Sequence, residues 1–401
     1  MNYAIENGTI ITCDRKFRII KKGTILVMNG KIHDIFREEK AIPSKYERYD
    51  ATGKVILPGF IDSHTHQGLW DGSIGQMGSD GNEMTNPATP MVRAIDAINV
   101  DTPAFKEAVM GGVTTIHTGP GSGNVIGGEC VIVKTYAKSK IIDAYIMKAP
   151  SALKAALGEN PKRVYGAEKK LPSTRMGIAA VFRKAFIDAQ TYQKKWQDYE
   201  KKLADDSVKD KPSVPERDIA KENLVKVLNK EIPINIHCHQ ANDIVTAIRL
   251  IEEFDLNAML IHATEGEKIA EYIASKNIPA SIGPSLVGFE KPELRNISFT
   301  TPGVLHKAGV KISIQSDSFT RLKYFQVLPC MAVKEGLPIK EAIKAITINA
   351  AEMIGVADRI GSLEKGKDAD IVVWSDNPIE NFYAENLWTL VNGETAYKKE
   401  E

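Results

Sequence analysis

The sequence predicts an α/β protein in which a (β/α)8 barrel fills the middle of the chain and β-rich segments form both ends. Between about residues 58 and 356, short β-branched runs alternate with amphipathic helical patterns. These runs are apolar throughout, which is typical of parallel strands covered by helices. A doubly wound open sheet is the alternative. No GxGxxG or GxxxxGK[ST] motif opens any unit, which disfavours the nucleotide-binding form of that fold.

The two ends of the chain have a different pattern from the middle. Residues 1–57 contain short strand-like runs with Asn-Gly turns at 7–8 and 29–30. Residues 357–401 contain two more such runs, GSLEKGKDADIVVWSDNP and LWTLVNGETAY. We expect these β-rich ends to close into one sheet structure.

The expected strands of the middle region are separated by helical segments. We place strands at 113–119, 130–136, 233–239, 258–264, 278–283 and 310–318, and helices at segments such as DIVTAIRLIEEF and GEKIAEYIASK. Six to eight such units fit a (β/α)8 barrel. The charged stretch at about 185–230 interrupts this rhythm, and its Pro-containing break and many charges predict a solvated helical insertion.

Composition narrows the function classes. The chain has 401 residues, 43% of them hydrophobic, and 52 basic against 51 acidic side chains leave a formal charge of +1. This balance gives no broad basic face for nucleic acid or a membrane surface. The four cysteines are scattered and form no CxxC pair, and the N-terminus does not resemble a signal peptide. We therefore expect a cytoplasmic protein that acts on a small molecule.

Histidines gather at the predicted strand ends. The stretch GFIDSHTHQG places His64 and His66 two residues apart, so both side chains point to the same side of a strand. The stretch PINIHCH repeats this spacing with His237 and His239. Three other predicted strands end in His117, His262 and Asp317. The carboxyl ends of barrel strands converge at the face where active sites are built.

Imidazole nitrogen combined with carboxylate oxygen suits zinc or another divalent transition metal. A single histidine at a strand end is usually only hydrogen-bonded, but two HxH pairs with a further histidine and an aspartate predict a metal site. The expected ligands are His64, His66, His237, His262 and Asp317. We expect His239 to share this role or to contact the substrate, and His117 to lie behind the ligands or to line the substrate site.

Two motifs resemble signatures of the amidohydrolase superfamily. GFIDSHTH resembles its first barrel strand, and ITINAAEMIGVADRIGSLEKGKDADIVVWSDNP resembles its C-terminal signature. The inner pattern is most similar to the imidazolonepropionase and prolidase-like branch. The resemblance implies a composite β-sandwich from residues 1–57 and 357–401 beside a hydrolase barrel at 58–356. It also allows a homo-oligomer.

The resemblance assigns roles residue by residue. His64 and His66 match the metal ligands of the first strand, and His237 matches the ligand of the fifth strand. His262 matches a histidine that binds metal in binuclear members and substrate in mononuclear ones. Asp317 matches the aspartate of the eighth strand, which touches the metal and moves the proton. The implied cofactor is one or two divalent ions, Zn first, with Mn or Fe as alternatives.

Some positions depart from the pattern of the family. Deaminases and imidazolonepropionases carry a proton-shuttling glutamate three residues after the ligand of the fifth strand, where this chain has Gln240. An amide cannot exchange a proton as a carboxylate does. Many binuclear members use a carboxylated lysine, for which Lys134, Lys148 and Lys154 are the nearest candidates. Sugar deacetylases instead use a glutamate near the third strand, and Glu129 is a candidate for that role.

The predicted reaction is metal-dependent hydrolysis of a C–N bond in an amide or cyclic amide. Asp317 takes the proton of the attacking water and returns it to the leaving nitrogen. A deaminase of a heterocyclic base is the alternative, which Gln240 disfavours. A non-catalytic scaffold barrel is a more distant alternative, which the complete ligand set disfavours.

The substrate is the least determined part of the prediction. The glycine-rich loop at 119–129 offers backbone N–H groups to an anion, although its flexibility explains the glycines equally well. Arg175 or Arg163 could pair with a substrate carboxylate, and Arg321, shortly after Asp317, is a further candidate. Each of these arginines could equally be a surface or packing residue.

Overall fold

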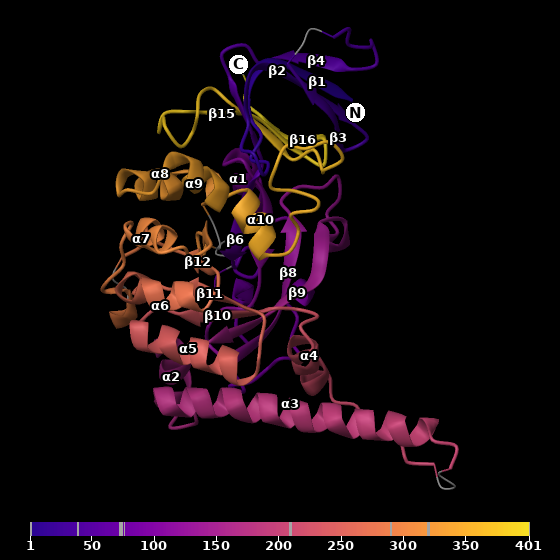
Figure 1. Cartoon of the computed structure of the whole chain (residues 1–401), viewed down its shortest axis with the longest axis vertical. Helices are drawn as coiled ribbons and strands as arrows, with labels where there is room; N and C mark the ends of the chain where they lie inside the picture. The colour runs from indigo at the N-terminus through magenta and orange to yellow at the C-terminus, as the bar shows by residue number, and fades with distance from the viewer. Residues whose placement is uncertain are drawn as a thin grey trace.

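The computed structural model describes residues 2–37, 40–71, 75, 77–207, 211–288, 291–318 and 321–400. A barrel-like body occupies the middle of the molecule, and a second sheet caps one end of it (Figure 1). Both chain termini lie at the capped end, and the long helix α3 lies at the opposite end (Figure 1). This arrangement matches the predicted division into a central α/β region and β-rich ends.

Among the described residues, eight strands form the barrel sheet in sequence order. They are β6 (Phe60–Thr65), β7 (Val113–Thr118), β8 (Ile126–Lys134), β9 (Ile146–Ala156), β10 (Ile234–Cys238), β11 (Ala258–His262), β12 (Ala280–Ile282) and β13 (Ile312–Ile314). The first and last strands approach each other, because the Ser63 hydroxyl lies 2.8 Å from the hydroxyls of both Ser281 and Ser313. The sheet is therefore nearly closed.

One strand departs from the predicted parallel arrangement. β8 runs antiparallel to both β7 and β9, whereas the sequence pattern predicted a parallel strand at 130–136. A parallel neighbour needs a crossover of a dozen or more residues, usually a helix. The short glycine-rich connection between β7 and β8 is too short for that crossover. The adjoining β9 was not predicted, because its sequence IMKAPSALKAA is rich in alanine, lysine and proline, which are depleted in strands, and it is buried only in its second half.

Helices cover the barrel wherever the parallel strands need crossovers. They are α1 (Pro103–Met110), α2 (Glu159–Ala167), α3 (Arg175–Ala204), α4 (Ile219–Leu228), α5 (Ala241–Glu253), α6 (Ala270–Ser275), α7 (Thr301–Lys307), α8 (Val327–Lys334), α9 (Ile339–Ala345) and α10 (Ile348–Met353). In α5, Ile244, Ala247, Ile248 and Ile251 recur at helical spacing and are all buried. This apolar stripe faces the barrel, as the sequence pattern predicted.

The helical insertion is only partly solvated. α3 begins at Arg175, earlier than predicted, and the Thr174 side chain caps it by accepting a hydrogen bond from the Gly177 N–H. Phe182 and Phe186 in its first half are buried and pack against Phe254, next to the end of α5. The second half extends past the barrel toward solvent (Figure 1). The charged residues correctly predicted the exposed second half of α3, but they gave no indication that its first half is buried.

The two ends of the chain join in one sheet. Its strands are β1 (Tyr3–Ile11), β2 (Ile19–Met28), β3 (Lys31–Phe36), β4 (Glu47–Asp50), β5 (Val55–Pro58), β14 (Ile371–Trp374), β15 (Asn386–Val391) and β16 (Glu394–Lys398). β14 pairs antiparallel with β5, so the C-terminal strands extend the N-terminal sheet. The two ends close into one sheet structure, as expected. The layering of this sheet as a sandwich and the domain limits stay predictions.

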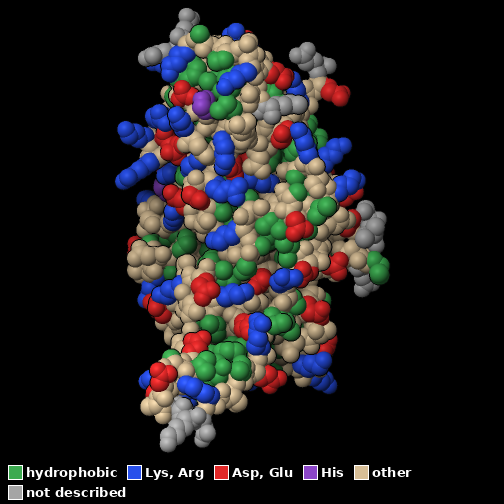
Figure 2. Space-filling view, turned by 90° about the vertical axis from the view of Figure 1, so that its right-hand side faces the viewer, with side chains coloured by type: hydrophobic (Ala, Val, Ile, Leu, Met, Phe, Trp, Pro, Cys, Tyr) green, Lys and Arg blue, Asp and Glu red, His purple; other side chains and the backbone are tan. Residues whose placement is uncertain are grey.

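The surface mixes both signs of charge. Figure 2 shows one face on which Lys and Arg side chains are interspersed with Asp and Glu side chains. This pattern agrees with the nearly balanced charge of the chain. No helix within the described ranges is long and apolar enough to cross a membrane.

Candidate metal centre

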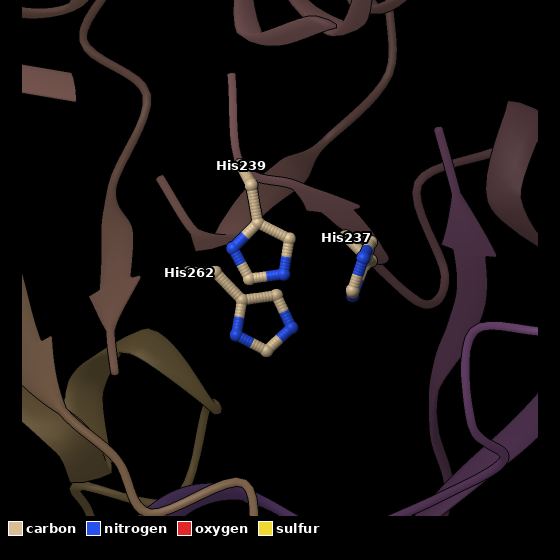
Figure 3. Close-up of side chains that lie close together, drawn as sticks. All are labelled: His237, His239 and His262. Atoms are coloured by element: carbon tan, nitrogen blue, oxygen red, sulfur yellow. The ribbon is translucent and has the colours of Figure 1, made fainter. Parts of the chain in front are cut away.

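The strand ends bring the predicted ligands together. His64 and His66 lie on or just after β6, His237 lies on β10, His262 ends β11, and Asp317 follows β13. Among the described residues, two groups have all their ligand atoms within 4.8 Å of one another. They are His237, His239 and His262, and His64, His262 and Asp317. Figure 3 shows the first group, with the three imidazole rings gathered around a common space.

The HxH pair of β6 faces the Asp317 carboxylate. The Nε2 atoms of His64 and His66 each lie 3.2 Å from Asp317 Oδ1. His66 Nδ1 lies 2.8 Å from the carbonyl oxygen of Gly119, so Nδ1 carries the proton and Nε2 presents a lone pair. A lone pair facing a carboxylate oxygen is repulsive unless a cation lies between them. This donor set therefore fits a divalent ion.

Two histidines of the group in Figure 3, His239 and His262, are also held through their Nδ1 atoms. His262 Nδ1 donates to the carbonyl oxygen of Gly283 at 2.6 Å, and His239 Nδ1 lies 2.7 Å from the Thr264 hydroxyl. In the described structure, the buried Nε2 atoms of His239 and His262 have no hydrogen-bond partner. Buried polar atoms are rarely left unpaired, so these nitrogens are open for a metal ion.

The electrostatics keep the ligands in the form that binds metal. Burial lowers the pKa of His64, His237, His239 and His262 well below the usual value, so these imidazoles are neutral at pH 7. The nearby His262 holds the pKa of Asp317 well below its usual range, although burial alone would raise it. Neutral imidazole and ionised carboxylate are the ligand forms of these groups.

One of the three candidate lysines lies at this centre. Lys154 is buried on β9, and its Nζ is 3.1 Å from His64 Nε2. Burial lowers the pKa of this lysine to about 8. Lys134 instead pairs with Asp370 at 2.5 Å, beneath the terminal sheet. Lys148 lines a separate hollow with Lys230 and other residues remote from the histidines.

Glu129 lies on the other face of the wall. It pairs in register with Leu153, next to Lys154, and successive strand residues point to opposite faces. Its carboxylate contacts Lys226 of α4 at 3.1 Å. Glu129 belongs to neither group of ligand atoms found among the described residues.

His117 lies inside the barrel but outside both ligand groups. Its Nε2 is 2.9 Å from the Ser151 hydroxyl, and burial lowers its pKa to about 3. It is a buried, neutral imidazole that contacts Ser151 of β9.

Arg175 is already paired. Its guanidinium donates to both carboxylate oxygens of Asp243 at 2.8 and 3.1 Å, and to Gln240 Oε1 at 2.6 Å. This bidentate pair links the start of α3 to α5. Arg175 thus also holds the side chain of Gln240, and its contact with a substrate stays a prediction.

A buried glutamate was missed by the sequence reasoning. Glu293 Oε1 lies 3.5 Å from His237 Nε2 and 3.7 Å from His239 Nε2, and it contacts Lys291 at 2.7 Å. It comes from the loop between β12 and α7, where the sequence EKPELRN reads as an ordinary polar turn. Nothing in this local pattern indicates that its carboxylate is buried.

A cavity of about 800 Å³ opens beside the centre and reaches His239 and Asp317. It is large enough for a small organic molecule. The chain therefore combines a metal-ligand set, a carboxylate that can move a proton and an adjoining space for a substrate.

Comparison with known proteins identifies the family. The model of the amidohydrolase family matches residues 55–395. The chain belongs to the amidohydrolase family. It is thus a hydrolase that acts on carbon–nitrogen bonds, as the motifs predicted. Members of this family generally use divalent metals, and the histidine and aspartate groups described above are suited to bind one.

Individual relatives agree with this assignment. The amidohydrolase tasK of Hapsidospora irregularis is 27% identical over 378 residues, which cover 89% of this chain but 38% of tasK. An imidazolonepropionase of Thermoplasma volcanium is 27% identical over 377 residues, covering 88% of this chain and 84% of the relative. The chain thus spans well under half of tasK but most of the imidazolonepropionase.

Solved structures support the fold of this amidohydrolase. The crystal structure of an amidohydrolase from Thermotoga maritima MSB8 superposes with a TM-score of 0.92 at 38% identity, covering 99% of this chain and 100% of the other. A prolidase in complex with N-methylphosphonate-L-proline has a TM-score of 0.63 at 15% identity, with both chains fully covered. The second likeness concerns the fold alone.

Proposed function

We propose that this protein hydrolyses the C–N bond of an amide or cyclic amide with the help of bound divalent metal. The observation that carries the proposal is the arrangement of lone-pair nitrogens and one carboxylate around a common space beside the cavity. Asp317 Oδ1 faces the Nε2 atoms of both His64 and His66 at 3.2 Å. The name of one relative, imidazolonepropionase, supports the same kind of bond.

The residues support two neighbouring ion positions, which share His262. His64, His262 and Asp317, with His66 beside them, would hold one ion, and His237, His239 and His262 would hold the other. Lys154 presents a buried amine beside His64. If this amine were carboxylated, Lys154 would supply an anionic ligand for both ions. Nitrogen-rich ligation favours Zn, with Mn or Fe as alternatives.

The metal would lower the pKa of water to about 7, so that hydroxide is available at neutral pH. Asp317 is placed to accept the proton of the attacking water, because its carboxylate is ionised and lines the cavity. It then returns this proton to the leaving nitrogen. His239, which lines the same cavity, can stabilise the developing charge on the substrate carbonyl oxygen.

The alternatives are less well supported. A deaminase would need a proton shuttle at Gln240, but this amide accepts a hydrogen bond from Arg175 and has no acidic proton. A scaffold barrel would not need buried ligand atoms without hydrogen-bond partners, as found at His239 Nε2, His262 Nε2 and Asp317 Oδ1 among the described residues.

The role of Asp317 can be tested by one substitution. We expect Asp317→Asn to lower kcat by about 10²–10⁴-fold on any amide that the wild type cleaves, because the proton acceptor is lost. Metal content should stay largely unchanged, since the histidines remain. Turnover of dipeptides, N-acyl amino acids and cyclic amides, with metal analysis, is the measurement.

The matched control is Asp255→Asn, which removes an exposed carboxylate paired with Lys230. This control should keep wild-type turnover. An Asp317→Asn enzyme that turns over as fast as the control would rule out the role of Asp317.

A further inference from the structure

The cavity beside the metal centre has an apolar wall. One side comes from the loop after β12 and the other from the segment that leads into α8. The apolar lining residues are Pro284, Leu286, Val287, Leu294, Leu322, Phe325 and Leu328. Leu286 keeps 62% of its surface exposed and Val287 keeps 37%, although both are apolar. Exposed apolar side chains gathered in a cavity mark a surface that an apolar group can cover.

Two cationic side chains line the same cavity, but only one is available. Lys291 Nζ contacts the buried Glu293 carboxylate at 2.7 Å, which offsets its charge. Arg321 is exposed and, within the described part of the chain, pairs with no carboxylate. Among the described residues that line the cavity, Arg321 is therefore the cationic side chain without a carboxylate partner.

The backbone places Arg321 at the edge of the cavity. Arg321 has a φ of 69° and immediately precedes the short helix Leu322–Tyr324, of which Leu322 and Tyr324 also line the cavity. A left-handed conformation is uncommon for arginine and costs about 1 kcal/mol or more unless its surroundings hold it.

We propose that Arg321 is a specificity-determining residue that binds the carboxylate of the substrate, and that the substrate is an N-acyl amino acid or dipeptide with an apolar side chain. The proposal rests on the hydrolase function proposed above and names its substrate class. The amide carbonyl lies at the metal centre, the apolar side chain covers Leu286 and Val287, and the carboxylate pairs with Arg321. Arginine suits this contact because its planar fork matches a carboxylate.

The test compares a carboxylate with its neutral counterpart. The probes are N-acetyl-L-leucine and N-acetyl-L-leucinamide, titrated by calorimetry into metal-loaded protein that carries Asp317→Asn to suppress turnover. We expect the acid to bind more tightly than the amide, and Arg321→Gln to weaken binding of the acid about tenfold while binding of the amide stays the same. Arg321→Lys should restore part of the preference, because it keeps the charge without the fork.

The matched control is Lys323→Ala, which removes a nearby positive charge that does not line the cavity. It should keep the preference for the acid. A second probe pair built on glycine should bind more weakly than the leucine pair, and Leu286→Ser should abolish that difference.

The proposal would be overturned if Arg321→Gln preferred the acid over the amide as strongly as its parent protein does. It would also be overturned if the parent protein bound acid and amide equally tightly, or bound neither. The function itself is tested separately by turnover with the wild type. Arginine-dependent binding without hydrolysis of any amide would contradict the hydrolase function and leave the recognition of the carboxylate in place.

Discussion

At the residue scale, the sequence predicted those metal ligands that can be recognised from their spacing along the chain. His64 and His66 lie two apart at a strand end, and they lie together in the structure beside Asp317. Lys154 could not be singled out among three lysines, because nothing local shows which of them faces the barrel interior. The burial of Glu293 could not be predicted for a related reason, since its carboxylate contacts Glu159 and His237, which are distant in the sequence.

His117 gives a prediction about pH and stability. Burial lowers its pKa to about 3, whereas the unfolded chain has a histidine pKa of about 6.5. Between these values the unfolded state binds one proton more than the folded state, so stability falls as pH falls through this window. In metal-free protein, His117→Asn should reduce the slope of unfolding free energy against pH by about 1.4 kcal/mol per pH unit.

Denaturant unfolding at several pH values between 4 and 6 measures this slope, and a variant of the exposed His33 serves as the control. An unchanged slope in His117→Asn would show that this imidazole does not remain neutral in the folded protein.

At the element scale, the alternation of apolar strand patterns with helical patterns predicted the parallel strands of the barrel. It did not predict that β8 is antiparallel. β8 carries the same β-branched pattern as its neighbours, and its direction is set by the short connections on either side. The contact between the end of β6 and the residues after β13 also could not be predicted from the sequence. There the Asp62 carboxylate accepts the N–H groups of His64 at 3.3 Å and Ser316 at 3.2 Å, together with the Ser316 hydroxyl.

This contact joins the first and last strands directly beneath the ligands His64 and Asp317. We expect Asp62→Ala to weaken metal binding about 10–100-fold, because partners that orient ligands have effects of this size. Metal retained against increasing chelator is the measurement. The control is Ser63→Ala, which loses hydroxyl contacts deeper in the barrel and should lower the melting temperature without changing metal affinity. Equal retention by both variants would contradict this role of Asp62.

At the scale of the whole molecule, the terminal sheet is tied to the barrel by buried charges. Lys134 on β8 contacts Asp370 at 2.5 Å and Asp368 at 3.2 Å, and Asp368 also pairs with Lys31 and Arg359. The sequence suggested that both ends meet, but these contacts link positions far apart in the chain. No local pattern could have predicted them.

Removing one member of this buried network leaves uncompensated charge. We expect Lys134→Met to lower the free energy of unfolding by about 3 kcal/mol. The control Lys140→Ala breaks an exposed pair with Asp101 and should cost about 1 kcal/mol or less. Denaturant unfolding measures both. A loss in Lys134→Met no larger than that of the control would show that the network does not hold the sheet to the barrel.

The most direct test of the metal-dependent function is elemental analysis of the purified protein beside His64→Ala/His66→Ala and Lys154→Met variants. We expect about two equivalents of Zn, Mn or Fe in the wild type, a marked loss in the double histidine variant and about one equivalent or less in Lys154→Met. Wild-type protein that holds no metal, and regains none when supplied with these ions, would contradict a metal-dependent hydrolase.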